Sequence, residues 1–216
     1  MKFLLFSKIS FEVSDPVALI ESYCFQSDFY ANYDYCLSER ERTIKDVNRI
    51  GARIGKEFLP NCRTVTESRG NLRIFKYDLD GFLQLDDKIR NNHIKELDEK
   101  VIKELKVKGI GLSKATKVLH TLHPKIIPII DNALQKEYKQ IKLEWAEEQS
   151  APILISYYNN FKKGDNWQNL TEIFNQIRSN NLVGLTKVRI FDILWWSYLK
   201  SKKLRQEKHI NWSTIE

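Results

Sequence analysis

Asp131 is the residue of this chain whose type and position most favour chemistry. It comes directly after the apolar run Ile126–Ile130 and before residues 132–134, where we expect a helix to begin. The partial positive charge at a helix N-terminus stabilises a carboxylate as an anion, so Asp131 is a candidate catalytic group. The alternative is that Asp131 only caps the following helix, a role in which aspartate is common.

A second candidate feature is Gly109-Ile110-Gly111, between two apolar helical patterns at 94–105 and 112–122. Glycines on both sides of one residue allow positive φ angles and a tight turn, and we expect Ile110 to plug the groove between the helices. Gly111 would open the second helix, where unpaired backbone N–H groups can bind phosphate. The segment predicts a helix-hairpin-helix that holds a DNA backbone, and the alternative is an ordinary connection that uses glycine to turn.

Lysines surround the predicted hairpin, and lysine–phosphate contacts make DNA binding sensitive to salt. Ala115, one turn into the second helix, would let the two helices pack closely. The whole chain carries a formal net charge of +7 and a pI near 9.2, which favours a polyanionic partner. We expect the DNA contacts to come from Lys108, Gly109, Ile110, Gly111, Ser113, Lys114 and Lys117.

Residues 109–134 resemble the hairpin-to-aspartate segment of the helix-hairpin-helix DNA glycosylase superfamily, and they are most similar to its adenine glycosylase branch. The remainder of the chain is similar to that superfamily only in being helical. The chain also resembles a group of uncharacterised bacterial proteins that have the same hairpin and a tryptophan-containing last helix. The resemblance rests on Gly109-Ile110-Gly111, Ser113, Ala115 and Pro128-Ile129-Ile130-Asp131.

The resemblance implies that Asp131 supports cleavage of the N-glycosidic bond of a damaged or mismatched base. The carboxylate would stabilise positive charge on the sugar and help to activate water. Where the strand-cleaving branch has a lysine nucleophile, this chain has Ser113, which cannot form a Schiff base. Lys114 is turned by about 100° around the helix from that position. We therefore expect a monofunctional glycosylase, with a non-catalytic DNA-binding module as the main alternative and an interaction protein as a third.

Cofactor sites are sparse in this sequence. Cys24, Cys36 and Cys62 are widely spaced, so we expect neither an iron–sulfur cluster nor a structural zinc site. The adenine branch usually has a cysteine cluster, and this absence leaves the excised base open. For His120 and His123 we expect protonated side chains or phosphate contacts rather than a metal site, because no third ligand is apparent. A monovalent cation at the hairpin is the one cofactor that the resemblance allows.

The elements that must position these residues are mostly helices. The chain has 216 residues, of which 42% are hydrophobic, enough to bury a core. We expect one helical domain, or two lobes that share a cleft, over residues 1–216, with residues 94–131 as the hairpin and aspartate segment. Residues 63–75 fit a small β hairpin around a Gly-Asn turn, or an irregular connection.

Two features of the chain bear on its location and on further DNA contacts. The apolar run in residues 1–8 is too short for a signal peptide, and no stretch approaches a membrane span, so we expect a cytoplasmic protein without membrane contact. Trp195 and Trp196 precede a basic segment at 200–208. That end of the chain is either a second phosphate contact or a solvated helix end with a buried tryptophan. The oligomeric state stays open.

Overall fold

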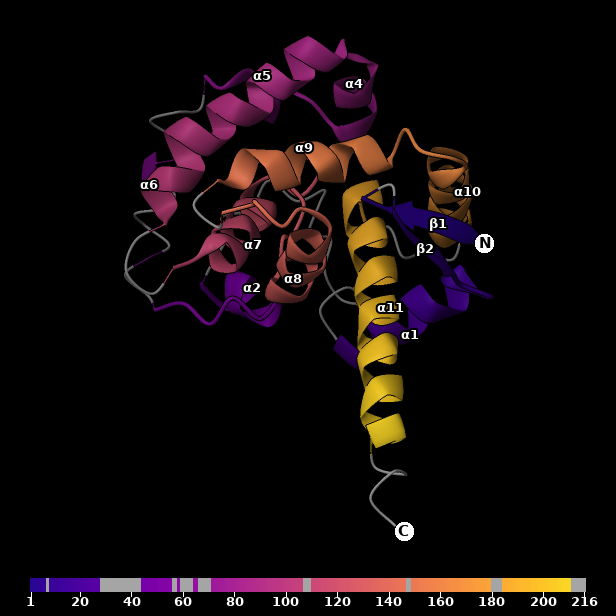
Figure 1. The fold of residues 1–216 in the computed structure, drawn as a ribbon. Helices are drawn as coiled ribbons and strands as arrows, with labels where there is room; N and C mark the ends of the chain where they lie inside the picture. The colour runs from indigo at the N-terminus through magenta and orange to yellow at the C-terminus, as the bar shows by residue number, and fades with distance from the viewer. Residues whose placement is uncertain are drawn as a thin grey trace.

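The protein is mostly helical, with one small antiparallel sheet near the N-terminus (Figure 1). The fold is taken from a computed structural model. It describes residues 1–6, 8–27, 44–55, 58, 64–65, 71–106, 110–146, 149–179 and 184–210.

Strands β1 (Lys2–Leu5) and β2 (Ile9–Glu12) form the sheet, in a register that pairs Lys2 with Glu12 and Leu5 with Ile9. Period-two alternation turns the side chains of Phe3, Leu5 and Phe11 into the core. We did not predict this hairpin from the sequence, because its strands are only four residues long. The sheet lies beside the C-terminal helices (Figure 1).

Two asparagines from the other end of the chain hold this sheet in place. Asn166 accepts a hydrogen bond from the backbone N–H of Leu4 and donates one to the carbonyl of Leu4, at 2.8 and 2.7 Å. Asn160 accepts a hydrogen bond from the N–H of Phe6 at 2.6 Å. The sheet is therefore anchored by contacts between residues far apart in the sequence.

Three of the helices begin at a capping aspartate. Asp78, Asp86 and Asp131 each accept a hydrogen bond from a backbone N–H of the first turn that follows. The helical elements are α1 (Pro16–Ser27), α2 (Ile44–Arg49), the 3₁₀ turn η1 (Arg73–Lys76), α4 (Leu79–Gln84), α5 (Asp87–Leu97), the π-helical turn η2 (Asp98–Ile102), α6 (Lys103–Leu105), α7 (Leu112–Leu122), α8 (Asn132–Ile141), α9 (Ser150–Asn160), α10 (Asn166–Ser179) and α11 (Lys187–Ile210).

The β hairpin expected at residues 63–75 is wrong for the residues of that stretch that the structure describes. Thr64 and Val65 are helical, and residues 73–76 form η1; residues 63 and 66–70 lie outside the described residues. The physical reason is packing, because η1 buries Ile74 in the core and stacks Phe75 on His123. Aromatic and β-branched residues served here to fill space against helices rather than to form a ladder.

One hydrophobic cluster unites residues of the sheet with residues of the helices on both sides of α9. The long helix α11, yellow in Figure 1, contacts α1, α8 and α10, while α5 packs on α9 and α2 on α7. Helix α7 and helix α11 thus belong to one packed body. No helix in the described part of the chain combines the length and apolarity that crossing a membrane requires.

Candidate functional site

The start of α7 is open to solvent at Gly111. Its backbone is extended, with φ −84° and ψ −177°, so the positive φ that we expected for the hairpin glycines does not occur at this one. A Cβ built on Gly111 would meet no atom within 4 Å, and the fold itself does not require glycine there. Gly111, the residue before the first turn of α7, is therefore exposed. Lys108 and Gly109 lie outside the described residues.

The neighbours of Gly111 divide into buried and half-buried residues. Ile110 is only 4% exposed, as expected of the plug between the helices, and Ala115 is fully buried. Ser113 and Lys114 are half-buried on the first turn of α7. Neither of them lines the cavity at Asp131 that is described below, so the predicted contact set is not one cluster.

The extended segment that leads to Asp131 is fixed to α7 by two side chains. His120 Nδ1 donates a hydrogen bond to the carbonyl of Ile127 at 2.6 Å, and Thr116 Oγ1 accepts one from the N–H of Ile130 at 3.1 Å. Both side chains are fully buried. Because α7 holds the segment in this way, the position of Asp131 relative to the start of α7 is determined by the fold.

Three further side chains form hydrogen bonds with the backbone of the same segment. Each comes from a different helix. The bonds are Tyr158 Oη to the carbonyl of Ile126 at 2.7 Å, Gln135 Nε2 to the carbonyl of Ile130 at 3.0 Å, and the N–H of Ile129 to Asp192 Oδ2 at 3.2 Å. Such satisfaction of a buried, non-helical backbone stabilises one conformation of the segment.

Burial keeps His120, which lies in α7, and His123, which is the C-cap of α7, neutral. It lowers the pKa of His120 to about 3 and that of His123 to about 4. Our expectation of protonated side chains is therefore wrong at neutral pH. His120 acts as a structural donor, and His123 stacks on Phe75 with ring centroids 4.0 Å apart. Among the described residues, no group of three histidine, cysteine or acidic side chains could hold a metal ion.

Asp131 both caps α8 and faces a cavity. Its Oδ1 accepts a hydrogen bond from the N–H of Leu134 at 2.9 Å, so the capping role that we held as the alternative does occur. Burial raises the pKa of the Asp131 carboxyl above its ordinary value, against the opposing effects of the Leu134 N–H and the charge of Lys117. Asp131 is thus a partly desolvated carboxylate with a nearby cation.

The cavity beside Asp131, which we call the Asp131 cavity, has a volume of about 280 Å³. That is the space of roughly nine water molecules and lies near the lower end of ligand pockets, which begin at about 300 Å³. A single nucleobase is a ligand of this scale. The lining comes from α1, the end of α2, α7, the segment before α8 and α11: Tyr23, Ile50, Gly51, Lys117, Ile129, Asp131, Arg189, Asp192, Ile193, Trp195 and Trp196.

Lys117 is the residue of α7 that reaches this cavity, one helical turn beyond Ser113. Its Nζ donates a hydrogen bond to the carbonyl of Gly51 at 3.1 Å. Burial lowers the pKa of Lys117, and Asp131 opposes that effect. In the described part of the chain, no carboxylate oxygen lies within the 4.0 Å of an ion pair to Lys117. The ammonium therefore faces the cavity without a direct ion pair.

Arg189 and Asp192, both on α11, line the cavity. Arg189 Nη2 donates to Tyr23 Oη at 2.8 Å, and its Nη1 lies 4.0 Å from Asp192 Oδ2. Asp192 is 1% exposed and also accepts hydrogen bonds from Tyr157 Oη and Trp195 Nε1, at 2.5 and 3.3 Å. Burial raises the pKa of Asp192 to about 7, although the Arg189 charge acts in the opposite direction.

Sequence reasoning missed Tyr23, Arg189 and Asp192 as parts of this site. A signal was present for the last two, because they are charged residues within the apolar run of residues 188–195. Buried charges inside such a run are costly unless they are paired. No signal in the sequence placed Tyr23 beside them. The tryptophan expected to be buried in the last helix is Trp195, which is 1% exposed.

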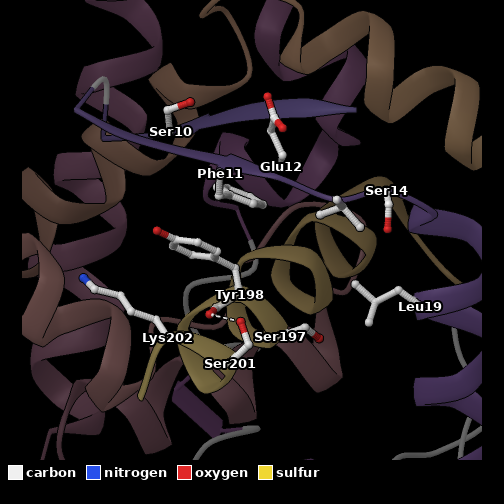
Figure 2. A pocket seen from close by; sticks show the side chains of 10 residues that line it. Ser10, Phe11, Glu12, Ser14, Leu19, Ser197, Tyr198, Ser201 and Lys202 are labelled. Carbon is white, nitrogen blue, oxygen red and sulfur yellow. Dashed lines mark hydrogen bonds between the residues drawn. The ribbon is translucent and has the colours of Figure 1, made fainter. Parts of the chain in front are cut away.

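A second, larger cavity of about 570 Å³ opens between β2, α1 and α11, and Figure 2 shows the side chains around it. We call it the Tyr198 cavity. The ring of Tyr198 stacks on Phe11 at 5.0 Å, and Ser201 Oγ donates to the carbonyl of Tyr198 at 2.8 Å. Its lining is Ser10, Phe11, Glu12, Val13, Ser14, Leu19, Ser197, Tyr198, Ser201 and Lys202.

Comparisons of this chain with protein-family models, with curated proteins and with solved structures found no match.

Proposed function

We propose that this protein binds DNA through the start of α7 and excises a damaged or mismatched base with Asp131 as the catalytic carboxylate. The observation that carries the proposal is that Asp131 lines a cavity of nucleobase scale. The likeness of residues 109–134 to the hairpin-to-aspartate segment of DNA glycosylases supports the same function. An extruded base would enter the cavity while the exposed turn at Gly111 receives a backbone phosphate.

The reaction would be hydrolysis of the bond between C1′ and the base. As that bond breaks, its electron pair leaves with the base, which takes up a proton, and positive charge develops on the sugar. The ionised Asp131 stabilises that charge, and a water oxygen then bonds to C1′ and loses its proton. Excision should therefore fall at acidic pH, as Asp131 becomes protonated. Because burial raises the pKa of Asp131, the fall begins above the pH at which an exposed aspartate titrates.

We propose that excision is monofunctional, since position 113 holds a serine. Lys117 then acts as the electrostatic partner of Asp131 and holds Gly51, rather than as a nucleophile. Incubation with a duplex that already contains an abasic site, followed by borohydride, should give no covalent adduct. An adduct that disappears in Lys117→Met and persists in Lys114→Met would replace this part of the proposal by a strand-cleaving activity.

The test of base excision uses duplexes with single damaged or mismatched bases, followed by heating in alkali to break the strand at abasic sites. Asp131→Asn should lower the rate of break formation by at least roughly 100-fold. Asparagine caps helices as well as aspartate does, so folding and DNA binding should persist. The matched control is Asp78→Asn, the same change at the cap of α4, where Asp78 accepts a hydrogen bond from the N–H of Gly81 at 2.9 Å.

The alternative function is a DNA-binding module without catalysis. The capping bond from Leu134 N–H to Asp131 favours it, because this bond gives the aspartate a structural role of its own. That alternative predicts salt-sensitive DNA binding and no alkali-dependent breaks with any lesion, for the protein and for Asp131→Asn alike. Absence of salt-sensitive DNA binding would exclude both functions.

A further inference from the structure

The hydrogen-bonding groups around the Asp131 cavity are strongly biased toward donors. Lys117 carries three N–H donors and no acceptor, and one of these donors goes to the carbonyl of Gly51. Arg189 lines the same cavity, and its side chain also carries only N–H donors. Its charge adds to the positive potential of the cavity. Any ligand in the cavity therefore meets at least one half-buried cation from α7.

The carboxylate groups that line the same cavity already accept hydrogen bonds from the protein. Both oxygens of Asp192 accept hydrogen bonds, Oδ1 from Tyr157 and Trp195 and Oδ2 from the N–H of Ile129. Asp131 Oδ1 accepts from the N–H of Leu134, and the N–H of Ala133 also acts on this carboxylate. In the proposed reaction that carboxylate faces the sugar. The base itself is thus left with donors to bind.

A donor-rich cavity discriminates between bases that differ in one group. Cytosine and adenine carry an exocyclic amino group, a donor, where uracil and hypoxanthine carry a carbonyl oxygen, an acceptor. A carbonyl can accept a hydrogen bond from Lys117, whereas an amino group would oppose donor to donor. A fully charged anion such as phosphate is disfavoured, because it would approach the Asp131 carboxylate in the same cavity.

We propose that the Asp131 cavity selects deaminated bases, those with a carbonyl oxygen in place of an exocyclic amino group, and that Lys117 is the residue that recognises this oxygen. The inference rests on the proposed function, since it names the substrate class of that site.

The test measures DNA binding with Asp131→Asn, which avoids differences between bases as leaving groups. Four duplexes of one sequence carry uracil, cytosine, hypoxanthine or adenine opposite a stable abasic analogue, so that no base is held by pairing. The carbonyl member of each pair should bind roughly tenfold more tightly than the amino member, the size expected when a buried donor loses its acceptor. Adding Lys117→Met should bring both ratios close to one. Adding Lys139→Met, the same charge change on an exposed residue of α8, should leave them unchanged.

The outcomes separate this inference from the proposed function. Equal binding of the two members of each pair, or tighter binding of the amino member, overturns the inference, as does a preference that survives Lys117→Met. Alkali-dependent breaks by the unmodified protein test excision independently. If it excises no base at all but the binding preference holds, the catalytic proposal fails while the inference about recognition stands. If it does not bind DNA, both fail.

Discussion

The Asp131 cavity and the Tyr198 cavity are both lined in part by α11, and they differ in size and in the charged groups that line them. The Tyr198 cavity is about twice as large, yet its polar lining is mostly serine hydroxyls, and Lys202 forms an ion pair with Glu137 at 3.2 Å. The Asp131 cavity is smaller and contains Lys117, Asp131, Arg189 and Asp192. Charges that are withdrawn from water around a small space are expensive to maintain.

This difference indicates which cavity is a candidate for chemistry. Perturbed titrating groups gather at functional sites more often than elsewhere, and the pKa values of Lys117, Asp131 and Asp192 are all shifted by burial. The Tyr198 cavity instead has stacked rings and a partly exposed ion pair as its main contacts. Volume alone would have favoured the Tyr198 cavity over the Asp131 cavity.

The largest expected effect tests whether the charges of the Asp131 cavity hold the fold together. Asp192→Leu removes the acceptor for Tyr157, Trp195 and Ile129, and with it the carboxylate oxygen that lies 4.0 Å from Arg189 Nη1. The free energy of unfolding should fall by about 3–5 kcal/mol, measured by denaturant titration. Ser197→Ala in the Tyr198 cavity should change it by less than about 0.5 kcal/mol. Equal effects would mean that the two cavities do not differ in this respect.

The second prediction concerns pH. The pKa of Asp192 is about 7 in the folded protein, against 3.8 for an ordinary aspartate, so the folded state binds the proton more tightly. Stability from this group is therefore present at low pH and is lost as pH rises from about 4 to about 7, by up to about 4 kcal/mol. The difference in unfolding free energy between the protein and Asp192→Asn isolates it from the histidines, whose lowered pKa values act in the opposite direction. If the difference in unfolding free energy between the protein and Asp192→Asn did not change with pH, the prediction would be contradicted.

The smallest expected effect is the coupling between Lys117 and Asp131. Lys117→Met removes a cation that lowers the pKa of Asp131, so that pKa should rise further. Carbon NMR of the Asp131 carboxyl during an acid titration measures the shift directly. Lys202→Met, the corresponding change in the Tyr198 cavity, should not move it. A pKa that is the same in both variants would show that the cation in the Asp131 cavity does not act on Asp131.

Local patterns in the sequence were sufficient for several elements. Three-to-four spacing of apolar residues predicted the helical class, and the position of Asp131 after an apolar run predicted the cap of α8. Burial of Ile110 between its glycines also followed from local pattern. These features were predictable because each depends on residues within a few positions of one another.

Only the tertiary structure decided where the charged side chains meet. Tyr23, Lys117 and Arg189 are far apart in the sequence and converge because α1, α7 and α11 pack into one body. The same applies to β1 and β2, whose short strands are held by Asn160 and Asn166, and to η1, where a strand was expected. The physical reason is that periodicity reports which face of an element is buried, not which other element buries it. A cavity forms where particular elements pack against one another. The sequence by itself therefore identified Asp131, but not the charged residues that face it.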